Sequence, residues 1–442
     1  MSGLQSRAVP TLGGRTRLPG DKSISHRALM LGALAVGRTR IAHLLEGEDV
    51  IRTAMAMRSM GARIERAADG VWQVDGVGVG GLSTPPDILD MGNSGTSTRL
   101  LMGLAATHPV SATFTGDASL RRRPMGRVIT PLARMGAEIA AAEGGRLPLM
   151  LRGTDDPLPI DYSPPVASAQ VKSAILLAAL NTPGRSIVRE THATRDHSER
   201  MLKAMGAHLH VEETAGGGRI IALDGPAELS PIMVEVPGDI SSATFPLVAA
   251  AILPGSEITL SAVGVNPLRD GILEALGAMG AEIALDHVRE AGGEPVADIR
   301  LRAPERLDAI HLDPAIAPRM IDEFPALFVA AACAEGTSRF TGLSELRVKE
   351  SDRIAAMARG LKAAGVRLRE LEDGIEITGD GRPPAGGARI ATELDHRIAM
   401  SFLVLGCKSR APIAIDDAAP IATSFPGFVA LMNGLGADIH PS

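Results

Sequence analysis

Three short polar segments carry side chains that can bind anions and move protons. The first, Leu18-Pro-Gly-Asp-Lys-Ser-Ile-Ser-His-Arg27, places Lys22, Ser23 and Arg27 in the first turns of an expected helix. Ser23 and Arg27 are four residues apart, so they share one helix face. An ammonium, a hydroxyl and a guanidinium at a helix start predict a clamp for a phosphate or carboxylate group. Taken alone, the segment fits a capped helix with solvated charges equally well.

The second segment is Arg347-Val-Lys-Glu-Ser-Asp-Arg353, in which five of seven residues are ionisable. Lys349, Glu350 and Arg353 can share one side of a turn that enters a helix. A carboxylate held among cations can act as a general acid or base, because its neighbours set its pKa. A solvated charged face is the other interpretation of this run.

The third segment, Asp395-His-Arg397, directly precedes the apolar run 398–405. Arg397 therefore faces the positive end of its own helix, which is unfavourable unless an anion lies between them. Asp322, in Met320-Ile-Asp-Glu-Phe, begins another expected helix and is either its N-cap or a catalytic group. The basic run Arg121-Arg-Arg-Pro-Met-Gly126 is too short, and too poor in aromatic residues, to indicate nucleic-acid binding.

A sixfold repeat positions these segments along the chain. Six apolar helical runs end in a glycine and restart as a short β-type stretch, at intervals of roughly 70 to 85 residues. Glycine suits that position because the residue after a helix often has φ > 0. The six glycines are Gly61, Gly136, Gly206, Gly280, Gly365 and Gly436.

Each repeat also has a related helix start, usually with a Ser, Thr, Asp or Asn suited to capping. Pro-Gly-Asp occurs at 19–21 and again at 237–239, which indicates two similar halves of three units each. Short strand signals between the helices predict units of the form β-α-β-α-β-β. The helix starts are 19–27, 92–99, 167–173, 237–244, 321–325 and 395–399, and the strand signals are 71–74, 220–223, 233–236, 299–301 and 375–378.

Composition limits the classes of function. The 442 residues include 45 Lys plus Arg against 51 Asp plus Glu, so any attraction for anions must be local. Aromatic residues make up only 2 %, which disfavours base stacking. Two cysteines, Cys333 and Cys407, exclude a disulfide framework, and neither a signal peptide nor a long apolar run is present. We expect a cytoplasmic enzyme that acts on small anionic substrates.

Together these segments resemble the 5-enolpyruvylshikimate-3-phosphate synthase family, also called 3-phosphoshikimate 1-carboxyvinyltransferase. The resemblance spans the chain, and its further motifs are Gly92-Asn-Ser-Gly-Thr96 and Arg123-Pro-Met-Gly126. It implies an α/β enolpyruvyl-transferase fold of two domains, each with three β-α-β-α-β-β repeats whose helix N-termini line a cleft. The implied domains are 22–235 and 1–21 with 236–442.

The resemblance also implies the reaction. The enolpyruvyl group of phosphoenolpyruvate moves to the 5-hydroxyl of shikimate 3-phosphate, and phosphate leaves by addition and elimination through a tetrahedral intermediate. No metal or organic cofactor takes part, and the enzyme is expected to be a monomer. The family closes its cleft around both substrates, which excludes water.

Site residues follow from the matching motifs. Glu350 is implied as the proton donor to the methylene carbon, Asp322 as the group that orients or deprotonates the hydroxyl, and His396 as an assistant in proton transfer. Lys22 contacts both substrates. The implied ligands of phosphoenolpyruvate are Lys22, Gly95, Arg123, Gln170, Arg353 and Arg397, and those of shikimate 3-phosphate are Lys22, Ser23, Arg27, Ser168, Ala169, Gln170, Arg195, Asp322 and Lys349.

The chain departs from the common family pattern in two places. Ser168-Ala169-Gln170 has one serine where many members have two, and Ala422-Thr-Ser-Phe-Pro426 lacks a lysine that many members carry. The first departure implies one lost hydroxyl contact, and the missing lysine, with the overall motifs, matches the second class of the family. Gly95 stands where glyphosate-tolerant members of that class have alanine, so we expect glyphosate to inhibit this enzyme.

Two other functions stay open at this point. UDP-N-acetylglucosamine enolpyruvyl transferase shares the fold, but it typically has a Lys-Asn pair early in the chain and a loop cysteine. Here the pair is Lys22-Ser23, and no cysteine precedes Cys333. A non-catalytic anion-binding protein would have little use for Asp322 and Glu350, because carboxylates among anion ligands are costly unless they handle protons.

Overall fold

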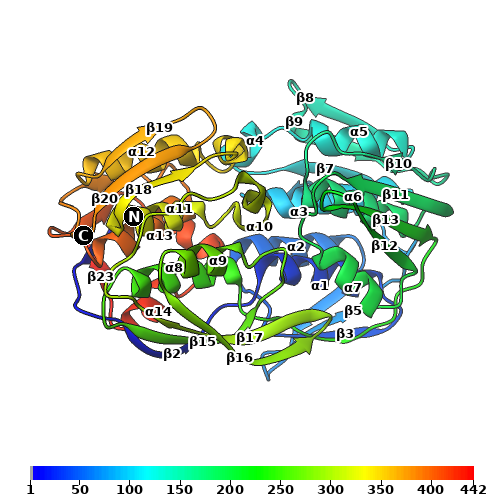
Figure 1. Ribbon diagram of the computed structural model, residues 1–442. Coiled ribbons are helices and arrows are strands. Elements are labelled where there is room, and N and C mark those ends of the chain that lie inside the picture. Colours follow the sequence, from blue (N-terminus) through cyan, green and yellow to red (C-terminus); the bar gives the residue numbers. More distant parts are fainter. Residues whose placement is uncertain (1–2) are drawn as a thin grey trace. The chain divides into compact units, whose positions relative to one another are not determined.

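The computed structural model describes residues 3–442, whose contacts divide them into two compact units (Figure 1). Each unit has its own hydrophobic core. Unit 2 comprises Gly20–Val236 and Glu290–Glu294. Unit 1 comprises residues 3–19, Pro237–Arg289 and Pro295–Ser442.

Within its described residues, unit 2 contains three four-stranded sheets. In each sheet one short edge strand runs parallel to its neighbour and the other pairs are antiparallel, as in the register Asp161↔Ile187 beside Ile187↔Ala222. The sheets are, in spatial order, β14 (Met233–Glu235), β3 (Arg38–Ala42), β5 (Trp72–Asp75) and β4 (Arg63–Arg66); β6 (Leu89–Asp90), β7 (Ser111–Thr115), β9 (Arg146–Arg152) and β8 (Glu138–Ala142); and β10 (Asp161–Tyr162), β11 (Gly184–Glu190), β13 (Gly218–Gly225) and β12 (Leu209–Thr214).

The helices of unit 2 are of two kinds. Three are buried on nearly every side, because their sequences are rich in Ala, Leu and Met, and they form the centre of the core. These are α1 (Lys22–Leu34), α3 (Gly95–Ala106) and α6 (Ala169–Ala179). The others are half-exposed and cover the sheets, namely α2 (Glu48–Ser59), α4 (Ala118–Arg122), α5 (Gly126–Arg134) and α7 (His197–Ala204).

Unit 1 repeats this plan in the residues that the structure describes. Its sheets are, in spatial order, β21 (Arg389–Ile390), β22 (Ile413–Ile415), β1 (Leu4–Arg7) and β23 (Asp438–Pro441); β16 (Glu282–Ala291), β17 (Glu294–Arg302), β15 (Glu257–Gly264) and β2 (Gly13–Arg17); and β18 (Glu335–Phe340), β20 (Ile375–Asp380) and β19 (Arg367–Glu370). The last sheet has three strands, and isolated parallel bridges such as Asp308↔Glu335 stand in place of its fourth.

The buried helices of unit 1 are α8 (Ile240–Ala251), α11 (Phe324–Cys333) and α13 (His396–Gly406). Phe324, Phe328 and Phe340 pack their rings together in this core, with centroids 5.4–6.0 Å apart. The remaining helices are α9 (Gly271–Ala278), α10 (Ala317–Met320), α12 (Arg353–Ala363) and α14 (Phe428–Gly434), with 3₁₀ turns at Pro314–Ile316, Ser344–Val348 and Ala419–Thr423.

The predicted repeat is confirmed at its glycines, at its strand segments and at most of its helix starts. All six repeat glycines have positive φ, from +82° at Gly365 to +110° at Gly61. The predicted strand segments fall in β5, β13, β14, β17 and β20. At five of the six predicted helix starts, a capping side chain accepts a hydrogen bond from a backbone N–H. These capping residues are Asp21, Ser94, Ser168, Asp239 and Asp395. Among residues 3–442, no helix combines the length and the apolar character needed to span a bilayer.

Candidate active site

The start of α1 is fixed by its cap, and Lys22 contacts a partner that the sequence did not indicate. Asp21 accepts a hydrogen bond from the backbone N–H of Ile24 at 2.9 Å. Lys22 forms a short ion pair with Asp49, in the first turn of α2, and the Asp49 side chain is only 6 % exposed. The ammonium is therefore held next to a buried carboxylate, with about a fifth of its side chain still exposed.

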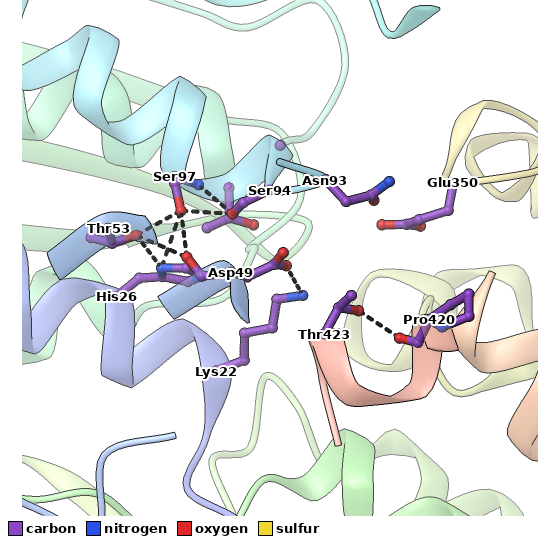
Figure 2. A network of polar contacts seen from close by, with 12 residues as sticks. Lys22, His26, Asp49, Thr53, Asn93, Ser94, Ser97, Glu350, Pro420 and Thr423 are labelled. Atoms are coloured by element: carbon purple, nitrogen blue, oxygen red, sulfur yellow. Dashed lines mark hydrogen bonds and ion pairs between the residues drawn. The ribbon is translucent and has the colours of Figure 1, made fainter. Parts of the chain in front are cut away.

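A buried polar network joins the starts of three helices of unit 2 (Figure 2). His26 Nδ1 lies 2.8 Å from the Thr53 hydroxyl on α2, which lies 2.6 Å from the Ser97 hydroxyl on α3. Ser97 also bonds Ser94, the N-cap of α3, at 2.6 Å. His26 thus ties the turn that carries Lys22 to the turn that carries Gly95.

His26 stays neutral in this network. Its ring is fully buried, and burial together with the nearby charges of Lys22 and Arg27 lowers its pKa well below the ordinary value. Its Nε2 has no hydrogen-bond partner among residues 3–442. A neutral imidazole here can bridge hydroxyls without adding charge to a turn that already holds two cations.

Gly95 lies between two arginines at the start of α3. A Cβ added there would lie 2.8 Å from Arg99 Nη1 and 3.2 Å from Arg123 Nη1. Arg123 donates to the Asn93 side-chain oxygen at 2.6 Å, and Arg99 donates to the Gln170 side-chain oxygen at 2.9 Å. The helix N-terminus and two guanidinium groups therefore converge on one small, Cβ-free position, which suits an anion.

Arg27 is 4 % exposed and is held by hydroxyl groups distant in sequence. Its Nε donates to Ser198 and its Nη2 to Ser173, both at 2.7 Å, while Nη1 donates to the Ser23 carbonyl at 2.9 Å. Burial lowers the pKa of Arg27 to about 10, and Glu199 and Asp21 offset part of that effect. The guanidinium remains charged at neutral pH and is fixed in position.

The start of α6 brings Gln170 to the Gly95 group. Ser168 caps the helix through Val171 N–H at 3.5 Å, and Ala169 begins it. The side-chain oxygen of Gln170 accepts hydrogen bonds from Arg99 and Arg127, and its side-chain nitrogen donates to the Thr96 hydroxyl at 3.1 Å. Of the residues predicted in unit 2, Gly95, Arg123 and Gln170 thus gather at one helix start, whereas Lys22 and Arg27 are held through Asp49 and the α6–α7 serines respectively.

In unit 1, one buried arginine joins three carboxylates. The Arg353 side chain is 1 % exposed and contacts Asp395 at 2.8 Å, Asp322 at 3.1 Å and Glu350 at 2.5 Å. Lys349 adds a second cation, 3.4 Å from Asp322. The exposed fractions of the Asp322 and Glu350 side chains are 15 % and 19 %, so these two carboxylates reach solvent while Asp395 does not.

Asp395 and Arg353 shift one another's pKa. Burial alone would raise the pKa of Asp395, but Arg353 more than offsets it and lowers that pKa below the usual range. Burial alone would lower the pKa of Arg353, but Asp395, Glu350 and Asp322 raise it. Both groups are therefore charged at neutral pH, and His396, 5 % exposed, also favours the Asp395 carboxylate.

The capping interpretation of Asp322 is wrong. The N-cap of α11 is Glu323, and its side chain makes no capping hydrogen bond. Asp322 instead joins the Arg353 group through its side chain, and its carbonyl oxygen accepts a hydrogen bond from Arg397 Nη1 at 2.9 Å. Arg397 lies in the first turn of α13, as predicted, beside the capping carboxylate of Asp395.

Sequence reasoning missed Asp49, Asn93 and Arg99. Arg99 follows Gly95 by four residues on a helix, so helical spacing alone places it on the same face. Asn93 lies within a motif that had already been singled out. Asp49 had only a weak local signal, an acidic residue in the first turn of a helix, which is ordinarily explained by the helix dipole.

Comparison with known proteins decides the family. The family model described as EPSP synthase (3-phosphoshikimate 1-carboxyvinyltransferase) matches residues 7–432. A 3-phosphoshikimate 1-carboxyvinyltransferase of Sphingopyxis alaskensis is 61 % identical over 435 residues, covering 97 % of each chain. The chain belongs to the EPSP synthase family. A relative of the same name from Paramagnetospirillum magneticum is 59 % identical over 436 residues, covering 99 % of this chain and 98 % of the other.

Solved structures agree with the fold. An EPSP synthase from Acinetobacter baumannii superposes with a TM-score of 0.88 at 45 % identity, with both chains covered completely. The enolpyruvyl transferase NikO from Streptomyces tendae gives a TM-score of 0.77 at 17 % identity, which indicates a shared fold only. The predicted α/β enolpyruvyl-transferase fold is confirmed, and the chain is a 3-phosphoshikimate 1-carboxyvinyltransferase of the shikimate pathway.

Proposed function

We propose that this EPSP synthase transfers the enolpyruvyl group by addition and elimination, without a metal or organic cofactor. Phosphoenolpyruvate and shikimate 3-phosphate are the substrates that family membership implies. The observation that supports the mechanism is the sharing of one buried guanidinium, that of Arg353, by Glu350 and Asp322. Two partly exposed carboxylates beside cations suit a reaction that moves protons between anionic substrates.

The steps assign one proton transfer to each carboxylate. Glu350 gives a proton to the methylene carbon of phosphoenolpyruvate, so the adjoining carbon becomes electrophilic. The 5-hydroxyl oxygen of shikimate 3-phosphate bonds to that carbon while Asp322 orients the hydroxyl or takes its proton. The tetrahedral intermediate then returns a methyl proton to the Glu350 carboxylate, and its carbon–oxygen bond to phosphate breaks, which gives the enolpyruvyl product and inorganic phosphate.

The cations bind the anionic groups of both substrates. Arg123, Arg353 and Arg397 bind the phosphate and carboxylate of phosphoenolpyruvate, Gly95 lets the α3 backbone approach it, and Lys22 contacts both substrates. His396 assists proton transfer. Support for Gly95 comes from the guanidinium groups that flank it in unit 2. We propose Ser23, Arg27, Ser168, Ala169, Gln170, Arg195, Asp322 and Lys349 as the residues that hold shikimate 3-phosphate.

Several finer properties belong to the same proposal. The functional domains are 22–235 and 1–21 with 236–442, and the enzyme works as a monomer in the cytoplasm, where two free, buried thiols such as Cys333 and Cys407 are stable. It belongs to the second class of the family, on its overall motifs and on the absence of a lysine shortly before Phe425. Light scattering on the purified enzyme tests the monomer, since a mass near twice 45.9 kDa would refute it.

We further propose that glyphosate inhibits the enzyme by occupying the place of phosphoenolpyruvate. Support comes from Gly95, which has no Cβ to fill the space next to Arg99 and Arg123. The wild-type enzyme should therefore lose activity in glyphosate, and added phosphoenolpyruvate should restore it. Full activity at millimolar glyphosate would refute the proposal.

Release of inorganic phosphate tests the reaction directly. The purified enzyme is incubated with both substrates, with each one alone, and with both in EDTA. Release that requires both substrates and persists in EDTA supports the proposal. Release that EDTA abolishes would refute the metal-free mechanism, and release with UDP-N-acetylglucosamine in place of shikimate 3-phosphate would refute the acceptor.

A further inference from the structure

A fully buried cluster of three charges lies in unit 2 next to the segment that carries Arg195. Lys172, on α6, has an exposed fraction of 0 %, and its Nζ lies 2.9 Å from Glu190 Oε2 and 2.7 Å from Glu199 Oε1. Glu190 ends β11, and Glu199 lies in the first turn of α7. The proposed mechanism gives none of the three a role, yet burying three charges is costly unless their arrangement is useful.

Glu190 is the carboxylate of the cluster that bonds the connecting segment between β11 and α7, and Lys172 bonds it too. Thr194 donates its hydroxyl to Glu190 Oε1 in a short hydrogen bond, and its N–H donates to Oε2 at 3.4 Å. Lys172 donates to the Thr194 carbonyl at 3.2 Å. The Lys172–Glu190 ion pair thus holds both the backbone and the side chain of Thr194.

The residues that follow Arg195 are held as well. Asp196 accepts hydrogen bonds from Arg200 at 2.9 Å and Arg219 at 3.4 Å. His197 donates to Glu294, which belongs to the same unit, at 2.7 Å. Thr194, Asp196 and His197 are all buried, whereas Arg195 between them is only partly buried.

We infer that Glu190 is a positioning residue: with Lys172 it fixes Thr194, and so holds Arg195 where it binds the phosphate of shikimate 3-phosphate. The inference rests on the proposed role of Arg195. Arg195 lies close enough to Arg27 to lower the pKa of that second arginine, so the two guanidinium charges repel one another. The fixed backbone around Arg195 keeps its guanidinium near Arg27 despite their mutual repulsion. A phosphate bound between them would relieve that repulsion.

The test compares the two carboxylates that share Lys172. Glu190→Met and Glu199→Met each remove one buried carboxylate and leave Lys172 paired with the other, so each retains a balanced ion pair. Glu190→Met alone also releases Thr194. We expect it to raise the KM for shikimate 3-phosphate about tenfold, the value of one charge-assisted hydrogen bond, with kcat and the KM for phosphoenolpyruvate nearly unchanged. Glu199→Met should leave all three constants near wild type.

A double-mutant cycle with Arg195→Ala decides whether Glu190 acts through Arg195. If it does, Glu190→Met adds no further rise in KM once Arg195 is gone. Equal effects of Glu190→Met and Glu199→Met, or additive effects in the double variant, would overturn the inference. An unchanged KM in Arg195→Ala alone would refute the proposed role of Arg195 and, with it, this inference.

A milder variant keeps the test independent of folding. Thr194→Val removes the hydroxyl that Glu190 holds, preserves the side-chain shape and leaves all three charges in place. It should raise the KM for shikimate 3-phosphate by a smaller factor than Glu190→Met does. Its melting temperature should stay within a few degrees of that of the wild type. A wild-type KM in folded Thr194→Val, beside an Arg195→Ala variant whose KM has risen, would overturn the inference.

Discussion

Arg353 Nε donates a hydrogen bond to Asp395 Oδ2 at 2.8 Å, and the two side chains are 1 % and 0 % exposed. The residues are 42 positions apart and lie at the starts of α12 and α13. The bond fixes the guanidinium that Glu350 and Asp322 share. Asp395 therefore governs the position of the proposed catalytic carboxylates without being exposed to substrate.

Replacing Asp395 should cost stability in a pH-dependent manner. Asp395→Asn leaves Arg353 without its buried partner, so we expect a loss of about 3 kcal/mol in the free energy of unfolding at pH 7, measured in urea. The folded-state pKa of Asp395 is lowered, so its stabilisation is present above the unfolded value of about 3.9 and disappears as pH falls through the folded value.

The matched control is Asp75→Asn, which breaks an exposed ion pair with Arg38 and should cost much less. The difference between wild type and Asp395→Asn should be constant from pH 5 to 7 and shrink below about pH 4. A difference that persists in acid would contradict this account.

Adding a methyl group at Gly95 should weaken the binding of glyphosate more than the binding of phosphoenolpyruvate. In Gly95→Ala the new Cβ lies too close to Arg99 Nη1, so the guanidinium tips must shift. We expect the glyphosate concentration for half inhibition to rise about tenfold or more, with kcat retained and a smaller rise in the KM for phosphoenolpyruvate. Gly277→Ala, on α9, is the control: an added Cβ there would meet nothing within 4 Å, so neither the half-inhibiting glyphosate concentration nor the KM for phosphoenolpyruvate should change. Unaltered inhibition in Gly95→Ala would show that the methyl group is tolerated and refute the proposed contact.

Removing the proposed proton donor should lower kcat far more than it changes binding. Glu350→Gln keeps the shape of the side chain beside Arg353 but has no acidic proton to give. We expect kcat for phosphate release to fall by about 10²–10⁴-fold, with the KM for shikimate 3-phosphate within about threefold.

Glu370→Gln is the control for that variant, because Glu370 also pairs with an arginine, Arg347, at 3.1 Å, on a strand. Its kcat should stay near wild type. A kcat in Glu350→Gln within a few-fold of wild type would remove Glu350 from the proton transfer.

His26 should make the enzyme less stable as pH falls below neutrality. The folded-state pKa of His26 is well below the unfolded value of 6.5. At a pH between the folded and the unfolded pKa, the unfolded chain binds a proton at His26 and the folded chain does not. Stability should therefore fall with decreasing pH by up to about 1.4 kcal/mol per unit from this group. Unfolding in urea at pH 7.5, 6.5 and 5.5 measures the slope.

His26→Asn should remove that contribution, because an amide can bond Thr53 without titrating. The slope of the variant should be flatter than that of wild type, whereas His192→Asn, at an exposed position, should keep the wild-type slope. Equal slopes in wild type and His26→Asn would contradict a depressed His26 pKa.

Local patterns in the sequence were enough to predict the repeat and the residues at the helix starts. The six glycines and the capping residues act within a single turn, and turn geometry depends on neighbouring residues. Gly95, Arg353 and Arg397 could be singled out for the same reason, because each belongs to a contiguous motif at a helix start. The motifs were also enough to predict the family, and the 61 % identity to a known relative confirmed that prediction.

Only the tertiary structure decided which distant side chains hold those motifs in place. Arg27 bonds Ser173 and Ser198, 146 and 171 residues away, and Lys172 joins two carboxylates on different elements. A buried charge gives no periodic signal, since its partners are chosen by the packing of helices and sheets that bury it. The sequence by itself therefore determined the repeat, the fold family and the candidate residues for the reaction, whereas packing determined the partners that fix the positions and charges of those residues.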